Sequence, residues 1–538
     1  MTGPWWVGAT IYHAYVRSFR DSDGDGHGDL GGVLEKLDYL VELGITALWM
    51  SPIMPSPDHD WGYDVSDYRD VHPDLGTLET LDALIARCAG HGIRVILDLV
   101  PNHTSSAHPW FIESASSPLS PFRDYYVWAD PRPDGTPPNN WVDDTGAPAW
   151  TWDDRTQQYY LHNFLDTQPD LNWWHPAVHD EFARIVDFWF DRGVAGFRID
   201  VANGLYHDKL LRDNPSHPRA HIGDTEIQGR YGIQHVYNFN QPEVHDVYRR
   251  WRVQAESREQ SRLLMGETWV SRVDELAPYY GDGDGDGDEL QLALNFPFLF
   301  APFEAPALAR VVADSVAAFP EGACMVWASS NHDVSRAATR WGAGDPRRAR
   351  LAQTIVALLP GTYVLYYGDG LGMIDSDIPG PLHRDPLTAG NLNGQWARDN
   401  ARAPMRWDAS EGGGFSAGEP WLPIHPETEH NVADQSHDPG SQLALVRKLI
   451  SARRIHLSDP AARYREISVA KDSWEFDSGP LRVRANFSDR DVAIEHTGSP
   501  ILSSRTVHPH SGTTLGPWEA VVTLRDSGTS GPPGTKLS

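Results

Sequence analysis

Charged side chains end four apolar stretches of this chain, where buried strands normally avoid charge. The clearest stretch is GVAGFRID at 193–200, in which Arg198 and Asp200 share one face of a predicted strand. Because Arg198 lies two residues from Asp200, its cation would hold that carboxyl ionised and oriented. Asp200 is therefore a candidate nucleophile. The other three stretches end in Asp98 with Asn102 and His103, in Glu267, and in His332 with Asp333.

Alternating strands and helices are expected to position these side chains. Apolar runs recur from Ile11 onward and are separated by helical stripes such as the one at 33–43, so the sheet is predicted to be parallel. Eight strands are predicted, among them 290–296, and a last amphipathic helix covers 442–453. This pattern predicts an α/β fold, a (β/α)8 TIM barrel, in which catalytic residues stand at the carboxyl ends of several strands. The four charged strand ends are expected to meet there.

Two segments depart from this alternation. Residues 104–172 are rich in Pro, Trp, Asp and Ser without clear periodicity, which predicts a subdomain inserted after strand 3 and overhanging the pocket. Short alternating runs predict a C-terminal antiparallel β domain over 456–526, and the tail 527–538 is predicted to be disordered. The barrel is then expected to comprise 1–103 and 173–455.

Composition limits the partners and the compartment. Lys and Arg number 45 against 74 Asp and Glu, and the net charge of −29 argues against nucleic acid or an anionic membrane as a partner. The 2 cysteines imply no disulfide framework and fit a reducing compartment. Because neither a secretory leader nor a run of about 18 apolar residues is found, we expect a cytoplasmic protein. No organic cofactor is expected, and the oligomeric state is left open.

The segment DSDGDGHGD at 21–29 alternates acidic residues with glycine and polar residues. Hard cations take oxygen ligands, so this loop predicts a structural Ca or Mg ion, with a solvated acidic turn as the alternative. It departs from the helix-loop-helix calcium motif because its twelfth position is Gly32, where a glutamate is needed. The expected ligands are the carboxylates of Asp21, Asp23, Asp25 and Asp29 and the backbone carbonyl of His27.

Four motifs in order give the chain a close resemblance to the α-amylase family of glycoside hydrolases. They are DLVPNH at 98–103, GFRIDVA at 196–202, GET at 266–268 and NHD at 331–333. Two further segments resemble motifs of its oligo-1,6-glucosidase and α-glucosidase branch, QPDLN at 168–172 and ARAPMRWD at 401–408. The resemblance extends from about Trp5 to the β domain.

The resemblance implies a role for each of three carboxyls. Asp200 would be the nucleophile, Glu267 the general acid and base, and Asp333 would bind sugar hydroxyls in the transition state. The chemistry of the residues agrees, because cleaving an acetal with retention needs an ionised carboxylate and a protonated acid, typically ~5 Å apart. The product of the first step would be a covalent glucosyl-enzyme.

The same resemblance implies substrate-binding residues. Tyr63 would stack on the terminal glucose and Asp64 would hydrogen-bond to it, while His103 and His332 would donate hydrogen bonds to sugar hydroxyls. An ion pair between Asp64 and Arg402 would close the pocket behind one glucose unit. A closed pocket implies attack at a chain end, so the predicted activity is a retaining exo-α-glucosidase that acts on short α-linked oligosaccharides or small α-glucosides.

Alternatives stay open. The segment GTYVLYYGDG at 361–370 lacks the proline, glutamine and paired glutamates that family members usually have there. The valine that follows the nucleophile, Val201, is similar to the residue at that place in enzymes of this branch that favour α-1,6 links. A glucosyl-transferring or isomerising relative, of the trehalose synthase or sucrose isomerase type, would intercept the intermediate with sugar instead of water. A non-catalytic amylase-like binding protein is the alternative from another class, although such proteins lose the catalytic carboxyls that this chain keeps.

Overall fold

The computed structural model describes residues 3–216, 232–282, 287–386, 397–494, 500–505 and 514–525. Its centre is an eight-stranded parallel sheet. The strands are β1 (Thr10–Ala14), β2 (Ala47–Met50), β3 (Arg94–Leu99), β7 (Gly196–Ile199), β8 (Leu263–Gly266), β9 (Leu292–Ala293), β10 (Val326–Ala328) and β11 (Thr362–Tyr366). The last strand, β11, pairs with β1, and the two ends of the strand order, β9 and β10, are consecutive in the chain. This is the order of a barrel, so the predicted (β/α)8 fold is confirmed.

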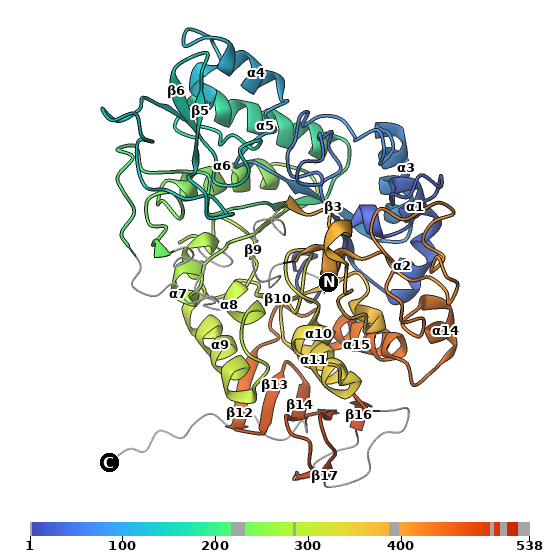
Figure 1. The fold of residues 1–538 in the computed structure, drawn as a ribbon. Coiled ribbons are helices and arrows are strands. Elements are labelled where there is room, and N and C mark those ends of the chain that lie inside the picture. Colours follow the sequence, from blue (N-terminus) through green and yellow to red (C-terminus); the bar gives the residue numbers. More distant parts are fainter. Residues whose placement is uncertain are drawn as a thin grey trace, which may run out of the picture.

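Helices connect successive strands and cover the outside of the sheet (Figure 1). The predicted helix at 33–43 is two helices, because Lys36 leaves the helical conformation at φ −101°. The predicted strand at 290–296 is shorter, because the Asn295 side chain accepts the N–H of Phe298 and starts a helix there. The helices of the barrel are α1 (Leu30–Glu35), α2 (Leu37–Leu43), α3 (Leu78–Gly90), α5 (Pro176–Asp191), α6 (Val244–Glu256), α7 (Val273–Leu276), α8 (Phe296–Leu299), α9 (Ala305–Ala318), α10 (Ala337–Arg340), α11 (Pro346–Leu358), α13 (Asp399–Arg402), α14 (Val432–His437) and α15 (Gln442–His456).

Smaller antiparallel sheets lie at opposite ends of the molecule (Figure 1). The segment inserted after β3 contains α4 (Pro109–Ser116) and an antiparallel sheet of β4 (Trp128–Ala129), β5 (Trp150–Asp153) and β6 (Gln158–Leu161). After α15 the chain forms a five-stranded antiparallel sheet and a two-stranded one. These strands are β12 (Tyr464–Ala470), β13 (Ser473–Ser478), β14 (Leu481–Asn486), β15 (Val492–Ala493), β16 (Pro500–Ser503), β17 (Thr514–Leu515) and β18 (Ala520–Leu524). The predicted disordered tail 527–538 lies outside the described residues.

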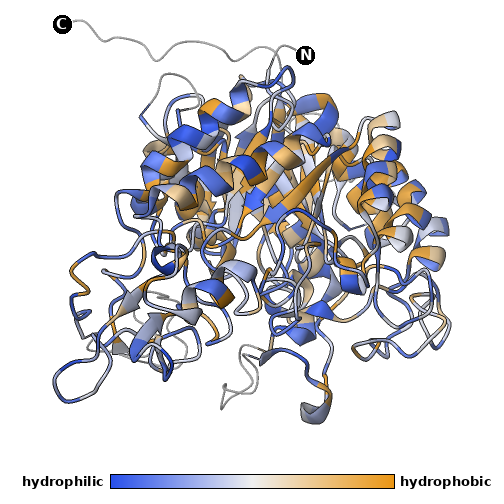
Figure 2. Cartoon of the chain, turned by 90° about the horizontal axis from the view of Figure 1, so that it is seen from above, coloured by the Kyte–Doolittle hydropathy of each residue, from blue (hydrophilic) through white to orange (hydrophobic). Residues whose placement is uncertain are grey.

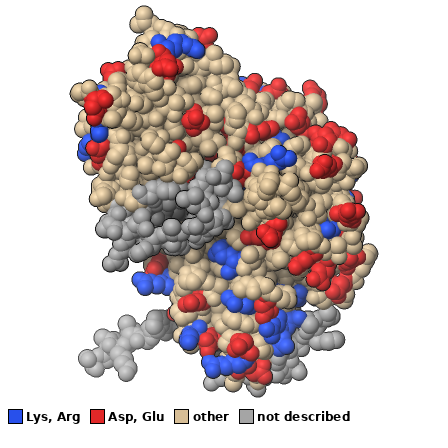
Figure 3. All heavy atoms as spheres, in the orientation of Figure 1, with Lys and Arg blue, Asp and Glu red and all other residues tan. Residues whose placement is uncertain are grey.

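Apolar side chains of the strands and of the inner helix faces form the core. In Figure 2 the central strands are orange, and the helices around them carry both orange and blue. On the face drawn in Figure 3, Asp and Glu form many separate small groups, whereas Lys and Arg gather mostly over the C-terminal sheet at the bottom. Within the described parts of the chain, none of the helices combines the length and apolar character that crossing a membrane requires.

Candidate active site

The guanidinium of Arg198 joins three carboxyls at the carboxyl ends of neighbouring strands. Asp98 of β3 is paired with Arg198 of β7 in the parallel ladder, and Asp200 and Glu267 directly follow β7 and β8. Arg198 Nη1 lies 2.7 Å from Asp98 Oδ1 and 2.7 Å from Asp200 Oδ1, and Nη2 forms an ion pair with Glu267 Oε1. The other oxygen of Glu267 accepts the N–H of Val201 at 3.0 Å. The structure therefore brings the predicted nucleophile and the predicted acid to one point.

Burial and mutual repulsion set the protonation of this cluster. Burial raises the pKa of Asp200, and the charges of Glu267 and Asp98 act in the same direction. Together they outweigh the opposing cation of Arg198, so the expectation that Arg198 alone keeps this carboxyl ionised is wrong. Burial also raises the pKa of Asp98 to about 7. One guanidinium balances only one of three buried negative charges, so the cluster favours retaining a proton at neutral pH. The arrangement can thus supply an ionised carboxylate and a protonated acid together, as acetal cleavage requires.

Two further guanidiniums hold Asp333, which follows β10. Arg402 Nη2 and Arg398 Nη1 lie 2.9 and 3.2 Å from Asp333 Oδ1. The two arginines are four residues apart at a helical turn, so they reach the same side. Burial alone would raise the pKa of Asp333, but the charges of Arg398 and Arg402 outweigh it and hold that pKa below its ordinary value. Asp333 is therefore an ionised and oriented hydrogen-bond acceptor.

Neutral rings line the site beside these carboxyls. The ring of His332 stacks on that of Tyr63 at 5.2 Å between centroids, and His332 Nε2 lies 3.0 Å from Asp333 Oδ2. Burial, together with the charge of Arg402, lowers the pKa of His332 well below its ordinary value. Burial lowers the pKa of His103 to about 4, and its Nε2 lies 3.0 Å from the Tyr63 carbonyl oxygen. Tyr63 in turn donates to Asp98 Oδ2 at 3.0 Å, so all of these predicted residues belong to one network.

The predicted ion pair between Asp64 and Arg402 is wrong. Asp64 is fully buried, and its carboxylate accepts Ser56 Oγ at 2.6 Å and the backbone N–H of Asp60 at 3.0 Å. Its hydrogen bonds thus organise the loop that carries it. Arg402 donates to the carbonyl oxygen of His332 at 2.8 Å, in addition to the carboxylate described above.

The ion pair that the structure shows instead uses residues four positions earlier in each segment. Asp60 Oδ1 lies 2.7 Å from Arg398 Nη2, and Arg398 also contacts Asp385 Oδ1 at 2.6 Å. Gln168 Nε2 donates to Asp60 Oδ2 at 3.2 Å. Asp60 stands four residues before Asp64, and Arg398 four before the arginine predicted from sequence. The presence of two candidates on each segment was the available signal, but sequence alone does not choose between them.

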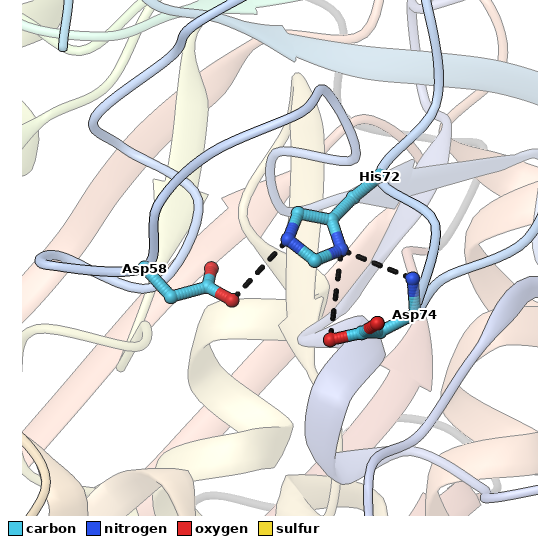
Figure 4. Close-up of side chains that lie close together, drawn as sticks. All are labelled: Asp58, His72 and Asp74. Atoms are coloured by element: carbon cyan, nitrogen blue, oxygen red, sulfur yellow. Dashed lines mark hydrogen bonds and ion pairs between the residues drawn. The ribbon is translucent and has the colours of Figure 1, made fainter. Parts of the chain in front are cut away.

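A second group of polar side chains contacts the same loop (Figure 4). His72 Nε2 lies 3.3 Å from Asp58 Oδ2, and His72 Nδ1 accepts the N–H of Asp74 at 3.1 Å. Arg17, in the 3-10 helix η1 (Val16–Ser18), is buried and donates to Asp58 Oδ1 at 2.7 Å. Because Arg17 already balances the charge of Asp58, this group is an ion-pair network for the loop and is a poor cation site.

The acidic loop at 21–29 brings some of its predicted ligands together. Carboxylate oxygens of Asp21, Asp23 and Asp29 lie within 4.8 Å of one another. Asp25 stands outside this group, and its carboxylate accepts the backbone N–H of His27 at 2.7 Å. Three carboxylates supply the hard oxygen donors that fit Ca or Mg. The cation itself stays a prediction.

The fold and these contacts define a class of protein. A (β/α)8 barrel with two adjacent carboxyls at the carboxyl ends of its strands, a third carboxylate beside them and neutral rings around them is suited to acid-assisted cleavage of a sugar acetal.

Comparison with known proteins gives the family. The sequence model of the protein family α-amylase, catalytic domain, matches residues 13–459. A probable α-glucosidase of Rhizobium meliloti (strain 1021) is 42% identical over 477 residues, which cover 87% of this chain and 85% of that protein. An oligo-1,6-glucosidase of Heyndrickxia coagulans is 34% identical and covers 96% and 99% of the two chains. A solved α-glucosyl transfer enzyme superposes with a TM-score of 0.90 at 36% identity, covering 97% of this chain and 100% of that one. The chain belongs to the α-amylase family of glycoside hydrolases.

Proposed function

We propose that this protein is a retaining exo-α-glucosidase that removes the terminal non-reducing α-linked glucose of short oligosaccharides or small glucosides. The observation that carries this proposal is the sharing of Arg198 by Asp200 and Glu267, which holds the two carboxyls side by side at one cation. The α-glucosidase and oligo-1,6-glucosidase relatives support the same substrate class.

The reaction would proceed in two displacements. A carboxylate oxygen of Asp200 attacks the anomeric carbon while Glu267 donates its proton to the departing glycosidic oxygen, which gives a β-linked glucosyl ester and a free alcohol. Glu267, now ionised, then takes a proton from water as the water oxygen displaces Asp200. The released sugar has the α configuration, because two inversions restore the starting geometry.

The remaining residues would hold one glucose. Ionised Asp333 is suited to accepting hydrogen bonds from the sugar hydroxyls as positive charge develops at the anomeric carbon. Tyr63 and His332 present stacked neutral rings beside it. The bridge between Asp60 and Arg398 supports a pocket closed behind a single glucose unit, which favours attack at the chain end.

Proton NMR of the glucose first released from an aryl α-glucoside tests this proposal, because only one sugar leaves such a substrate. The α-anomer should be released first and mutarotate later, and first release of the β-anomer would contradict a retaining mechanism. Turnover of maltose, isomaltose, trehalose and sucrose, measured side by side, would then define the linkage.

Glucosyl transfer is the second candidate, because the structural relative described above is an α-glucosyl transfer enzyme. In that reaction a sugar hydroxyl replaces water in the second displacement. Products larger than the substrate at high maltose concentration would favour transfer, and glucose as the sole product would favour hydrolysis.

A further inference from the structure

The turn that follows the nucleophile is joined to the segment that follows the acid by a side chain with no assigned role. The backbone bonds between the two segments continue past the strands, from the N–H of Glu267 to Ile199 O at 2.8 Å and from the N–H of Ala202 to Glu267 O at 2.9 Å. Beyond that point the side-chain amide of Asn203 takes over. Its Nδ2 donates to Trp269 O at 3.1 Å, and its Oδ1 accepts the N–H of Trp269 at 3.2 Å. Asn203 thus adds one more two-bond rung to the β7–β8 ladder.

The turn itself needs such support. Val201 is β-branched and has a φ of +45°, a left-handed conformation that costs free energy unless the surroundings enforce it. In this conformation its N–H reaches Glu267 Oε2 at 3.0 Å. Asn203 is 3% exposed, and its own carbonyl oxygen accepts the N–H of Asn240 at 2.6 Å. Asn203 therefore holds the turn by its side chain, which binds Trp269, and by its backbone, which binds Asn240.

We propose that Asn203 is a positioning residue that sets the separation between Asp200 and Glu267. It stands three residues after Asp200, and its two bonds reach Trp269, two residues after Glu267. Without these bonds the turn that keeps Val201 at a positive φ loses its support. The bond from the Val201 N–H to Glu267 Oε2 is lost with it, and the carboxyl of the acid is no longer aimed at the departing oxygen. A misplacement of about 1 Å costs on the order of 100-fold in rate. This inference rests on the roles proposed above for the two carboxyls.

The test compares two substrates that differ in their need for an acid. Fluoride leaves α-glucosyl fluoride with little help from a proton, whereas the alcohol that leaves maltose needs one. The parameter kcat/KM reports only the formation of the glucosyl-enzyme. In Asn203→Ala we expect kcat/KM to fall about 100-fold for maltose, as for a misplacement of that size, and only a few-fold for α-glucosyl fluoride.

The matched control is Asn140→Ala. The side chain of Asn140 makes the same pair of bonds with another residue. Its Nδ2 donates to the carbonyl oxygen of Asn214 at 2.9 Å, and its Oδ1 accepts the N–H of Asn214 at 2.7 Å. Asn140 belongs to the inserted segment and lies away from the carboxyls. It should leave kcat/KM for both substrates near the native values. If Asn203→Ala does not fold, Asn203→Asp keeps the acceptor and loses the donor at similar size, and the same selective loss is expected.

The outcomes separate the two proposals. Equal losses on both substrates, or no loss on either, in a folded Asn203 variant would overturn the positioning role and leave the proposed function intact. A native enzyme that is inert toward both substrates would overturn the proposed function, and the positioning role with it.

Discussion

Removing the charge of Arg402 should disable Asp333 selectively. Arg402 is fully buried, lies 2.9 Å from Asp333 Oδ1 and also donates to His332 O at 2.8 Å. Removing one partner of a buried ion pair costs about 3 to 5 kcal/mol. Because Arg398 still contacts the same carboxylate, we take the lower end, about 3 kcal/mol of folding stability, for Arg402→Met. The loss of one of its two cations also leaves Asp333 less well placed, and a misplacement of about 1 Å lowers kcat/KM on the order of 100-fold.

The sign of the pH effect follows from the same contacts. The cations of Arg398 and Arg402 outweigh burial and hold the pKa of Asp333 below its ordinary value, so losing one cation raises that pKa. Asp333 then takes up a proton at a higher pH than in the native enzyme. The acid limb of the kcat/KM profile for an aryl α-glucoside should therefore move to higher pH in Arg402→Met.

Arg453→Met is the matched control, because Arg453 is also fully buried but donates to backbone carbonyls such as Leu359 O at 2.9 Å in the barrel wall. It should lower the unfolding midpoint without moving the pH profile. An Arg402→Met enzyme with a native acid limb and kcat/KM within threefold of native would refute this account of Asp333.

Three other predictions concern the pocket, stability and the cation. Asp60→Asn should lower kcat/KM for maltose at least tenfold, because it weakens the ion pair with Arg398. Asp64→Asn should mainly lower the melting temperature. The reverse pattern would favour the pair of Asp64 and Arg402 that the sequence predicted. Burial lowers the pKa of His207 to about 4, so the unfolded chain binds its proton first and the histidine costs stability as the pH drops from about 6.5 towards 4. Because Asp98, with a pKa raised to about 7, acts in the opposite direction, the test compares the native enzyme with His207→Gln: the free energy of unfolding from urea titrations should fall by about 1.4 kcal/mol per pH unit less in the variant. Equal slopes in the two proteins would contradict burial of a neutral histidine. Chelation should lower the melting temperature by a few degrees, since a bound ion at about 100 times its Kd contributes about 2.7 kcal/mol, and Asp21→Asn should abolish the difference; no shift with EDTA would favour the solvated turn.

The strand ends could be predicted because their signal is local. Alternation with period two places Arg198 and Asp200 on one face, and parallel order brings the carboxyl ends of β3, β7 and β8 to one edge. These two rules are enough to predict that Asp98, Asp200 and Glu267 meet. The sequence predicted a contact of Arg198 with Asp200 only, and not its contacts with Asp98 and Glu267.

Loop pairings were harder because they depend on contacts between distant segments. Asp60 and Arg398 are 338 residues apart, and each segment offers a second residue of the same charge four residues away. Three-dimensional position decides the pairing, because the Asp64 carboxylate binds its own loop while that of Asp60 binds Arg398. The rung made by Asn203 was missed for a similar reason, since an amide that replaces a backbone ladder bond has no pattern in the sequence.

Trapping the intermediate tests the central claim most directly. Incubating the enzyme with 5-fluoro-α-glucosyl fluoride, followed by proteolysis and mass spectrometry, should find one fluoroglucosyl group per chain, attached to the peptide that carries GFRID and located on Asp200. Attachment to another carboxyl would contradict the account. So would an adduct that still forms in Asp200→Asn.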